Sequence, residues 1–156
     1  MTDDPTGTQA AIDAVGDRAT GELDPRVREH TAGEKQDGIP FIGAGPGDPG
    51  LLTVRGKELV DAADLVVHAG SLVSSALLED HCADAELVNS VGKDLEELIP
   101  LMRDAHEDGG TVVRLHSGDP AVYGAALEQL AALARARVPA YVVPGVTSPF
   151  AAAAAL

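Results

Sequence analysis

The sequence predicts an α/β fold with an open, mainly parallel sheet flanked by helices. From Ile39 onward, short apolar runs alternate with amphipathic stretches, which is typical of βαβ units. Three of the apolar runs lead directly into segments rich in glycine and proline, at residues 43–50, 116–124 and 144–148. Because parallel strands end at a common edge, where open α/β sheets bind their ligands, we expect these segments to form three neighbouring ligand loops.

The individual elements follow from composition and periodicity. The expected strands are short and rich in β-branched residues: Ile39–Gly43, Leu65–His68, Glu86–Val88, Thr111–Leu115 and Ala140–Val143. The expected helices alternate with them: residues 53–62 with Thr53 as N-cap, 74–79, 94–106, 121–135, and a last helix that begins at Ser148. In the stretch 94–106, one helical face is apolar, with Leu95, Leu98, Ile99 and Met102.

Domain organisation is expected to be simple. Residues 1–37 are rich in Asp, Glu, Thr, Gly and Ala without sustained periodicity, which predicts a disordered acidic leader. Residues 38–156 then form one domain of ordinary size. The chain ends in the alanine run of the last helix, which favours a protein half that lacks a second domain.

Composition excludes several classes of function. With 25 acidic and 11 basic residues the net charge is -14, which argues against unaided binding to nucleic acid or to an anionic membrane and suits a salt-adapted cytoplasm. The single Cys82 excludes an intrachain disulfide, and the scattered histidines show no metal-ligand spacing. No apolar run is long enough to span a bilayer, and the N-terminus does not resemble a signal peptide, so we expect a cytoplasmic protein.

A dinucleotide site is an alternative for the first loop, because residues 45–50 match the pattern G-x-G-x-x-G after a strand. Two features oppose it. Pro46 and Pro49 are unusual in such a turn, and the second strand ends at His68 with no acid to bind a ribose hydroxyl.

Polar residues in the loops have two interpretations each. Asp119 could accept hydrogen bonds from a ligand or cap the following helix, whereas Asp48 lies between turn-forming residues and favours a turn role. His116, at the mouth of the second loop, could touch a substrate or be an ordinary loop histidine. Thr147 and Ser148 could cap the last helix, bind a ligand, or both. The sequence shows no catalytic triad and no carboxylate pair placed for acid-base chemistry.

Four segments together resemble the tetrapyrrole methyltransferases of corrin synthesis, and their order and spacing fit throughout residues 39–156. They are residues 43–49 (GAGPGDP), 69–73 (AGSLV), 116–124 (HSGDPAVYG) and 144–152 (PGVTSPFAA). Residues 71–73 and 147–153 are most similar to the branch that methylates precorrin-4 or cobalt-precorrin-4 at ring carbon 11.

The resemblance implies a two-domain enzyme that uses S-adenosylmethionine as methyl donor and transfers the methyl group to a ring carbon by an SN2 step. Such a reaction needs alignment and a dry site more than an acid or a base. The resemblance also implies cofactor contacts at Pro46, Gly118, Asp119, Val122, Tyr123, Thr147 and Ser148, and substrate contacts at Asp48, Ser71 and His116.

The family's second domain would have to come from elsewhere, either from a homodimer or from a separate chain. A polycarboxylate substrate would also need local positive potential on this acidic chain, for which Arg114 is a candidate. Two alternatives stay open: a non-catalytic cofactor-binding or assembly fragment, and a relative of the uroporphyrinogen III or precorrin-2 methyltransferases. Against the latter, Ala69-Gly70 stands where that branch would show an Asp-Arg pair.

Overall fold

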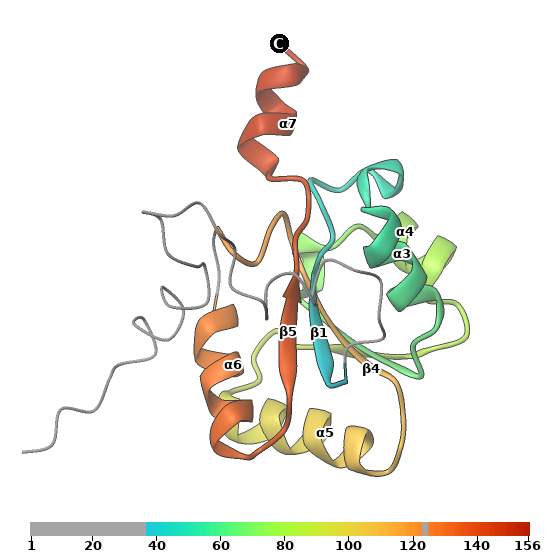
Figure 1. Cartoon of the computed structure of the whole chain (residues 1–156). Coiled ribbons are helices and arrows are strands. Elements are labelled where there is room, and N and C mark those ends of the chain that lie inside the picture. The colour runs from blue at the N-terminus through green and yellow to red at the C-terminus, as the bar shows by residue number, and fades with distance from the viewer. Residues whose placement is uncertain (1–36, 123–124) are drawn as a thin grey trace, which may run out of the picture. The chain divides into compact units, whose positions relative to one another are not determined.

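Five parallel strands form a single sheet in the computed structural model, which describes residues 37–122 and 125–156. The order across the sheet is β3-β2-β4-β1-β5 (Figure 1). The strands are β1 (Ile39–Gly43), β2 (Leu65–His68), β3 (Glu86–Asn89), β4 (Val112–His116) and β5 (Ala140–Val143). The expected leader lies outside the described residues apart from Asp37, as does Tyr123.

Helices cover both faces of the sheet. They are α3 (Val54–Asp61), α4 (Ser75–His81), α5 (Leu95–Glu107), α6 (Ala126–Arg135) and α7 (Ser148–Ala154), with single 3₁₀ turns η1 (Pro49–Leu51) and η2 (Gly70–Leu72). Helices α3 and α4 lie on one face and α5 and α6 on the other (Figure 1).

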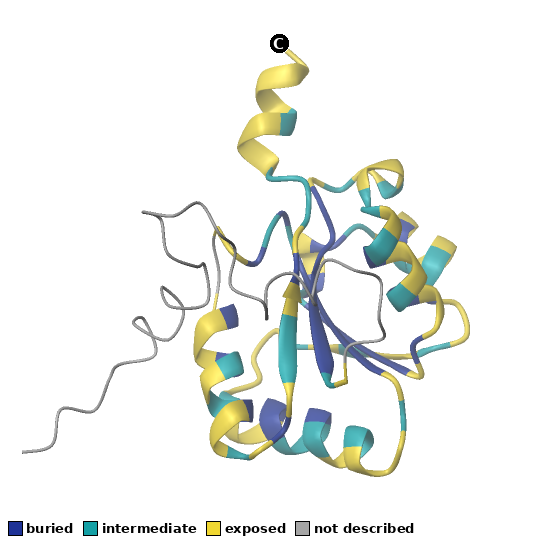
Figure 2. Cartoon of the chain, in the orientation of Figure 1, coloured by how far each residue is buried: buried dark blue, intermediate teal, exposed yellow. Residues whose placement is uncertain are grey.

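The alternation of side chains along each strand creates two separate cores. On one face, Phe41 and Val67 pack with Met102 of α5 and Leu133 of α6. On the other face, Ile42 and its neighbours pack with residues of α3 and α4. The central strands are therefore buried on both sides, while the outer surfaces of the helices are exposed (Figure 2).

The connections define a switch point between β1 and β4. The chain leaves β1, passes through α3 and reaches β2, which lies beyond β4; it leaves β4, passes through α6 and reaches β5, which lies beyond β1. The loops after these two neighbouring strands therefore diverge toward opposite faces. In open α/β sheets, ligands bind in the crevice that such divergence leaves at the carboxyl ends of the strands, called here the carboxyl edge.

The parallel α/β fold and its elements are confirmed, with two instructive differences. Strand β4 extends to His116, which was expected in the loop. Helix α6 begins at Ala126 rather than at residue 121, because the Asp119 carboxylate accepts a hydrogen bond from the Ala121 amide, 2.9 Å away, and closes a turn instead of a cap. The Asx turn is a local competitor of the helix that periodicity alone does not reveal.

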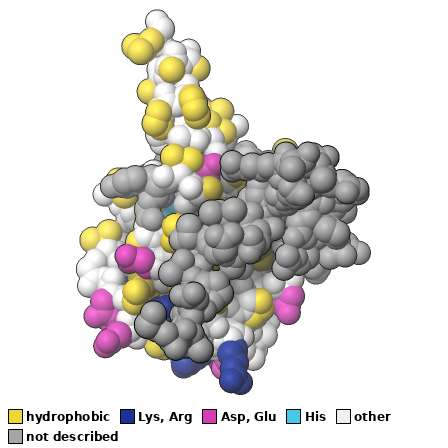
Figure 3. Space-filling model, turned by 60° about the vertical axis from the view of Figure 1, so that its left-hand side comes forward, with side chains coloured by type: hydrophobic (Ala, Val, Ile, Leu, Met, Phe, Trp, Pro, Cys, Tyr) yellow, Lys and Arg dark blue, Asp and Glu magenta, His cyan; other side chains and the backbone are white. Residues whose placement is uncertain are grey.

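Helix α7 extends past the carboxyl edge of the sheet (Figure 1). None of its residues is buried, and the Phe150 side chain is 76% exposed. Figure 3 shows hydrophobic side chains along this projecting helix.

Candidate functional site

The three loops expected from the sequence meet at the carboxyl edge. Gly45 of the first loop and Gly118 of the second exchange backbone hydrogen bonds, with N···O distances of 3.2 and 2.8 Å. The Ala44 amide donates to the His116 carbonyl oxygen over 2.7 Å. The first and second loops are thus joined directly across the switch point, where the fold predicts a ligand crevice.

Close backbone packing explains the glycines at this place. A Cβ atom on Gly43 or Gly145 would collide with the Gly118 carbonyl oxygen, so no larger residue fits at either position without a shift. Gly118 itself has a φ of 63°, in the left-handed region that favours glycine. The third loop is therefore locked against the other two by main-chain contact.

In the first loop, Pro46 and Asp48 are both exposed. The Asp48 carboxylate accepts a hydrogen bond from the Gly50 amide over 2.8 Å and caps η1, so its expected turn role is confirmed. The Thr53 hydroxyl accepts from the Gly56 amide over 3.1 Å, which confirms the N-cap of α3. These two caps fix the backbone between β1 and α3.

In the second loop, Asp119 is half-buried and Val122 is 64% exposed. One oxygen of the Asp119 carboxylate holds the turn. A carboxylate has a second oxygen, and thus further acceptor capacity for a ligand hydroxyl or amine. Both expected cofactor contacts lie at the carboxyl edge.

In the third loop, Thr147 and Ser148 begin α7. Thr147 occupies the N-cap position, but its side chain makes no capping hydrogen bond. The Ser148 hydroxyl lies beside Gly118, because it would be 3.3 Å from a Cβ built there. Ser148 therefore adjoins the second loop, and Thr147 directly precedes it.

His116 was expected at the mouth of the second loop, and this prediction is wrong. It is the last residue of β4 and only 6% exposed. Its ring stacks on Phe41 with centroids 5.6 Å apart. Burial, helped by the charge of Arg114, lowers the pKa of His116 to about 4, so the ring is neutral at pH 7. Among the described residues, its Nε2 atom has no hydrogen-bond partner. A direct contact with substrate would require a path to this buried ring.

His68, at the end of β2, is similar. It is 9% exposed, and burial is the main reason that its pKa is lowered.

The turn η2 follows β2, with Ser71 exposed and Gly70 at a φ of 60°. A Cβ on Gly70 would collide with Val91, so η2 lies directly against the segment that follows β3.

Arg114 is the residue whose environment the sequence did not reveal. It is 3% exposed, and its guanidinium donates hydrogen bonds to groups of β2, β4, α6 and the segment after β3. Burial lowers its pKa to about 10, so it stays charged at pH 7. A lone arginine in the otherwise apolar run Thr111–Leu115 is the signal that could have identified it.

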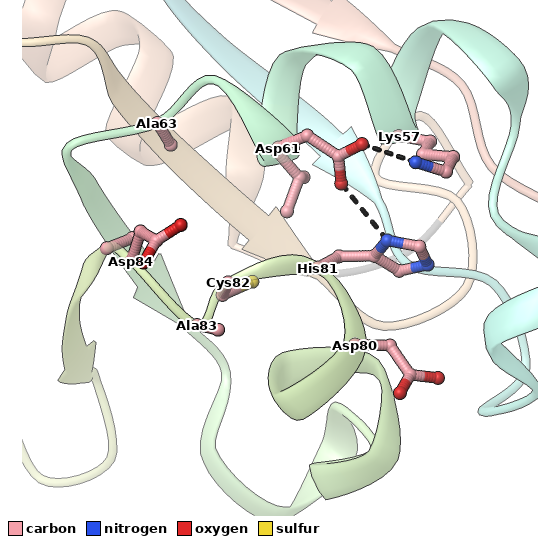
Figure 4. A pocket seen from close by; sticks show the side chains of 10 residues that line it. Lys57, Asp61, Ala63, Asp80, His81, Cys82, Ala83 and Asp84 are labelled. Carbon is pink, nitrogen blue, oxygen red and sulfur yellow. Dashed lines mark hydrogen bonds and ion pairs between the residues drawn. The ribbon is translucent and has the colours of Figure 1, made fainter.

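A pocket of about 240 Å³ lies elsewhere, among the C-terminal ends of α3 and α4 and the segment before β3 (Figure 4). There, Asp61 pairs with both Lys57 and His81, the latter over 3.0 Å. These two hydrogen bonds lower the pKa of Asp61, the Lys57 bond most. The buried Cys82 also lines the pocket, and burial raises its pKa to about 11, so the thiol is not reactive at pH 7. The pocket adjoins the amino ends of β2 and β3, away from the glycine loops.

Residues 37–122 and 125–156 contain neither a candidate metal site nor a candidate membrane-spanning helix. No cluster of His, Cys, Asp and Glu there could hold a metal ion. None of the helices in these ranges has the length and apolarity that crossing a membrane requires.

A parallel sheet with glycine loops joined at its switch point defines the class of α/β domains that bind a small ligand at the carboxyl edge. The family model for tetrapyrrole (corrin/porphyrin) methylases matches residues 38–156. The chain belongs to this family.

Individual relatives are similar over the same region. The chain is 48% identical over 118 residues to the cobalt-precorrin-4 C(11)-methyltransferase of Methanocaldococcus jannaschii, a match that covers 76% of this chain and 46% of that protein. It is 49% identical over 118 residues to the precorrin-4 C(11)-methyltransferase of Pseudomonas aeruginosa, with 76% and 47% covered. The chain thus spans about half the length of these curated relatives.

Solved structures give the same result. The cobalt precorrin-4 methyltransferase CbiF is similar with a TM-score of 0.72 and 50% identity, over 75% of this chain and 49% of that one. The uroporphyrin-III C-methyltransferase of Thermus thermophilus, solved with S-adenosylhomocysteine, has a TM-score of 0.64 and 40% identity, over 74% and 51%.

Proposed function

We propose that the chain takes part in S-adenosylmethionine-dependent methyl transfer to ring carbon 11 of precorrin-4 or cobalt-precorrin-4, in cobalamin biosynthesis. The main support is the 48–52% identity to relatives that bear these names, over the region that contains all three loops. The junction of these loops at the switch point is the structural observation that favours a cofactor site there.

The residues present fit such a cofactor. The backbones of the three loops pack closely through their glycines. Pro46, Asp119 and Val122 remain accessible at the carboxyl edge, and Thr147 and Ser148 of the third loop lie at the same edge. When bound, S-adenosylmethionine would supply an activated methyl group. The roles proposed for this chain are to bind the adenosine beside Pro46, to accept a hydrogen bond at Asp119, and to align the donor while excluding water.

The remaining parts of the proposal concern the whole assembly. Residues 1–37 form an acidic leader ahead of the methylase domain. A second domain contributes to catalysis, since the matched region is only about half of the curated relatives, and the reaction takes place in the cytoplasm. Exposed Ser71 and Asp48 face the substrate side.

Calorimetric titration with S-adenosylhomocysteine tests the proposal. Asp119→Asn keeps an oxygen that can hold the turn to Ala121 and removes the charge, whereas Asp119→Ala removes both. Loss of a hydrogen bond to a charged group should weaken binding about tenfold or more in both variants. Asp84→Ala is the control, because Asp84 is exposed and lines the distant pocket. If the folded wild-type chain does not bind the cofactor product, or if Asp119→Asn and Asp84→Ala bind equally, the proposed cofactor site is wrong.

An assembly fragment is the second candidate, and the exposed α7 with Phe150 favours it. A fragment of this kind would dimerise or capture another chain through α7 without binding S-adenosylhomocysteine. Sedimentation of the wild-type chain and of Phe150→Ser, beside the titration, separates the two candidates.

A further inference from the structure

Within the part of the chain that the structure describes, the Arg114 guanidinium is a buried cation without a buried anion. Its Nε donates to Gln129 Oε1 over 2.8 Å, and its Nη1 donates to the Val67 and Leu115 carbonyl oxygens over 3.0 and 3.2 Å. Its Nη2 donates to Ser90 Oγ over 3.1 Å. All four acceptors are neutral, and no charged partner among the described residues counteracts the burial that lowers the Arg114 pKa. Buried charges in proteins are normally paired, so this one needs an explanation.

Two hydrogen-bond donors at the same point have no acceptor in residues 37–122 and 125–156. A guanidinium has five N–H groups, and the four bonds above leave one N–H on Nη2. The Ser90 hydroxyl accepts from Nη2, so its own proton is free to be donated, and it has no acceptor among the described residues. The two donor atoms are 3.1 Å apart. This spacing suits the two oxygens of one carboxylate, which arginine recognises best in a two-point arrangement.

The donor pair lies at the carboxyl edge. Ser90 is half-buried, directly follows β3, and donates its amide to the His68 carbonyl oxygen at the end of β2 over 2.9 Å. Arg114 lies in the middle of β4, and its side chain extends past Val67 of β2 to Ser90, so the pair lies close to the carboxyl ends of β2 and β3. Gly70 of η2 packs against Val91 and Asn89, the two residues on either side of Ser90, and Ser71 of η2 is exposed. A ligand at the switch point could therefore extend to this place along the same edge.

We propose that Ser90 Oγ and Arg114 Nη2 form a binding site for a carboxylate of a ligand bound at the carboxyl edge. The proposal rests on the proposed function for its ligand. A carboxylate could come from the periphery of an acidic tetrapyrrole or from the amino-acid end of the cofactor. On a chain with a net charge of -14, a buried cation that lies behind a half-exposed hydroxyl offers positive potential where an acidic ligand needs it.

Nuclear magnetic resonance of the full ¹⁵N-labelled chain tests this directly. The signals to follow are the Arg114 Nε–H and the Ser90 amide, during separate titrations with uroporphyrin, S-adenosylhomocysteine and propionate, with sodium chloride as the ionic-strength control. We expect saturable shifts of both signals with at least one carboxylate and none with chloride. A shift with uroporphyrin alone assigns the site to substrate, and a shift with S-adenosylhomocysteine assigns it to cofactor.

Three variants complete the test. Ser90→Ala should weaken the responding ligand about tenfold, as expected for a hydrogen bond to a charged group, and Ser90→Thr should restore most of the affinity because it keeps the hydroxyl. Ser75→Ala, an exposed serine of α4, should bind like wild type. The proposal is overturned if no carboxylate shifts the two signals, or if Ser90→Ala binds as tightly as Ser75→Ala.

Failure of the proposed function would look different. In that case S-adenosylhomocysteine would leave the amides of Gly45, Gly118 and Thr147 unshifted, whatever happens at Ser90. A response to propionate or uroporphyrin at Ser90 would then still support the carboxylate site.

Discussion

At the residue scale, the carboxyl half of β4 is unusual because ionisable side chains replace apolar ones. Arg114 and His116 point to the α5 and α6 face of the sheet, where Val112 of the same strand packs in the core. Both are more than nine-tenths buried. Arg114 remains charged and satisfies its hydrogen bonds mostly with carbonyl and amide oxygens, whereas His116 remains neutral. The two residues therefore respond to pH in different ranges.

The lowered pKa of His116 predicts a loss of stability in mild acid. The folded-state pKa is about 4 against an ordinary value of 6.5, so the unfolded chain binds the proton more tightly. Stability from this residue is complete above pH 6.5 and declines as the pH falls toward 4, by at most about 3 kcal/mol. His116→Gln should decline less over this interval, as measured by urea unfolding at several pH values. If the free energy of unfolding fell equally with pH in wild type and His116→Gln, the lowered pKa of His116 would be contradicted.

Gly145 tests the contact between the loops. In Gly145→Ala, the new methyl group would meet the backbone of Gly118 and Gly43, and overpacking of this kind costs about 1–3 kcal/mol. We also expect weaker binding of S-adenosylhomocysteine, because the loops must move apart. Gly109→Ala is the comparison: its Cβ enters open space, and only its φ of +89° is unfavourable. That variant should lose stability but keep its affinity.

At the element scale, α5 shows how local signals and tertiary packing agree. Asp94 accepts a hydrogen bond from the Glu97 amide over 3.0 Å, and the Glu97 carboxylate accepts one from the Asp94 amide over 3.2 Å, which forms a capping box. The apolar face predicted from the sequence is the one that packs, since Leu98, Ile99 and Met102 are buried. The capping residues therefore determine the start of this helix and the apolar periodicity determines its buried face, and both are present in the local sequence.

Removal of the cap should destabilise the domain measurably. Asp94→Ala deletes the acceptor for the Glu97 amide, which typically costs about 1 kcal/mol. Asp94→Asn retains an oxygen acceptor and should recover most of the loss. Urea unfolding followed by circular dichroism measures both; equal stability of Asp94→Ala and wild type would show that the capping box is not stabilising.

At the scale of the whole molecule, charge repulsion opposes folding. The whole chain carries a net charge of -14 at pH 7, so its carboxylates repel one another, and such repulsion is screened by salt. We expect the free energy of unfolding to rise as potassium chloride increases from about 0.1 M to about 1 M, where the screening length falls from about 10 Å to about 3 Å. Stability that is independent of salt over this range would contradict the expected salt adaptation.

The sequence determined the order of the elements and the edge at which the glycine loops lie. Alternating periodicities specify strands and helices locally, and the βαβ order forces the loops after β1, β4 and β5 to one edge. The resemblance in the loop motifs also led to the right family. These features depend on patterns between residues that are close in the sequence, so the sequence alone is enough to recognise them.

Only the tertiary structure decided which loop residues are caps and which groups become buried. Asp119 closes a turn, His116 enters the sheet, and Arg114 joins Ser90, which is 24 residues away in the sequence. The Asp119 turn is local, but its competition with a helix start is not visible in periodicity; the Arg114–Ser90 pair joins residues distant along the chain, and burial of His116 results from what packs on β4. The carboxylate site proposed at Ser90 is therefore visible in the folded domain and not in its sequence.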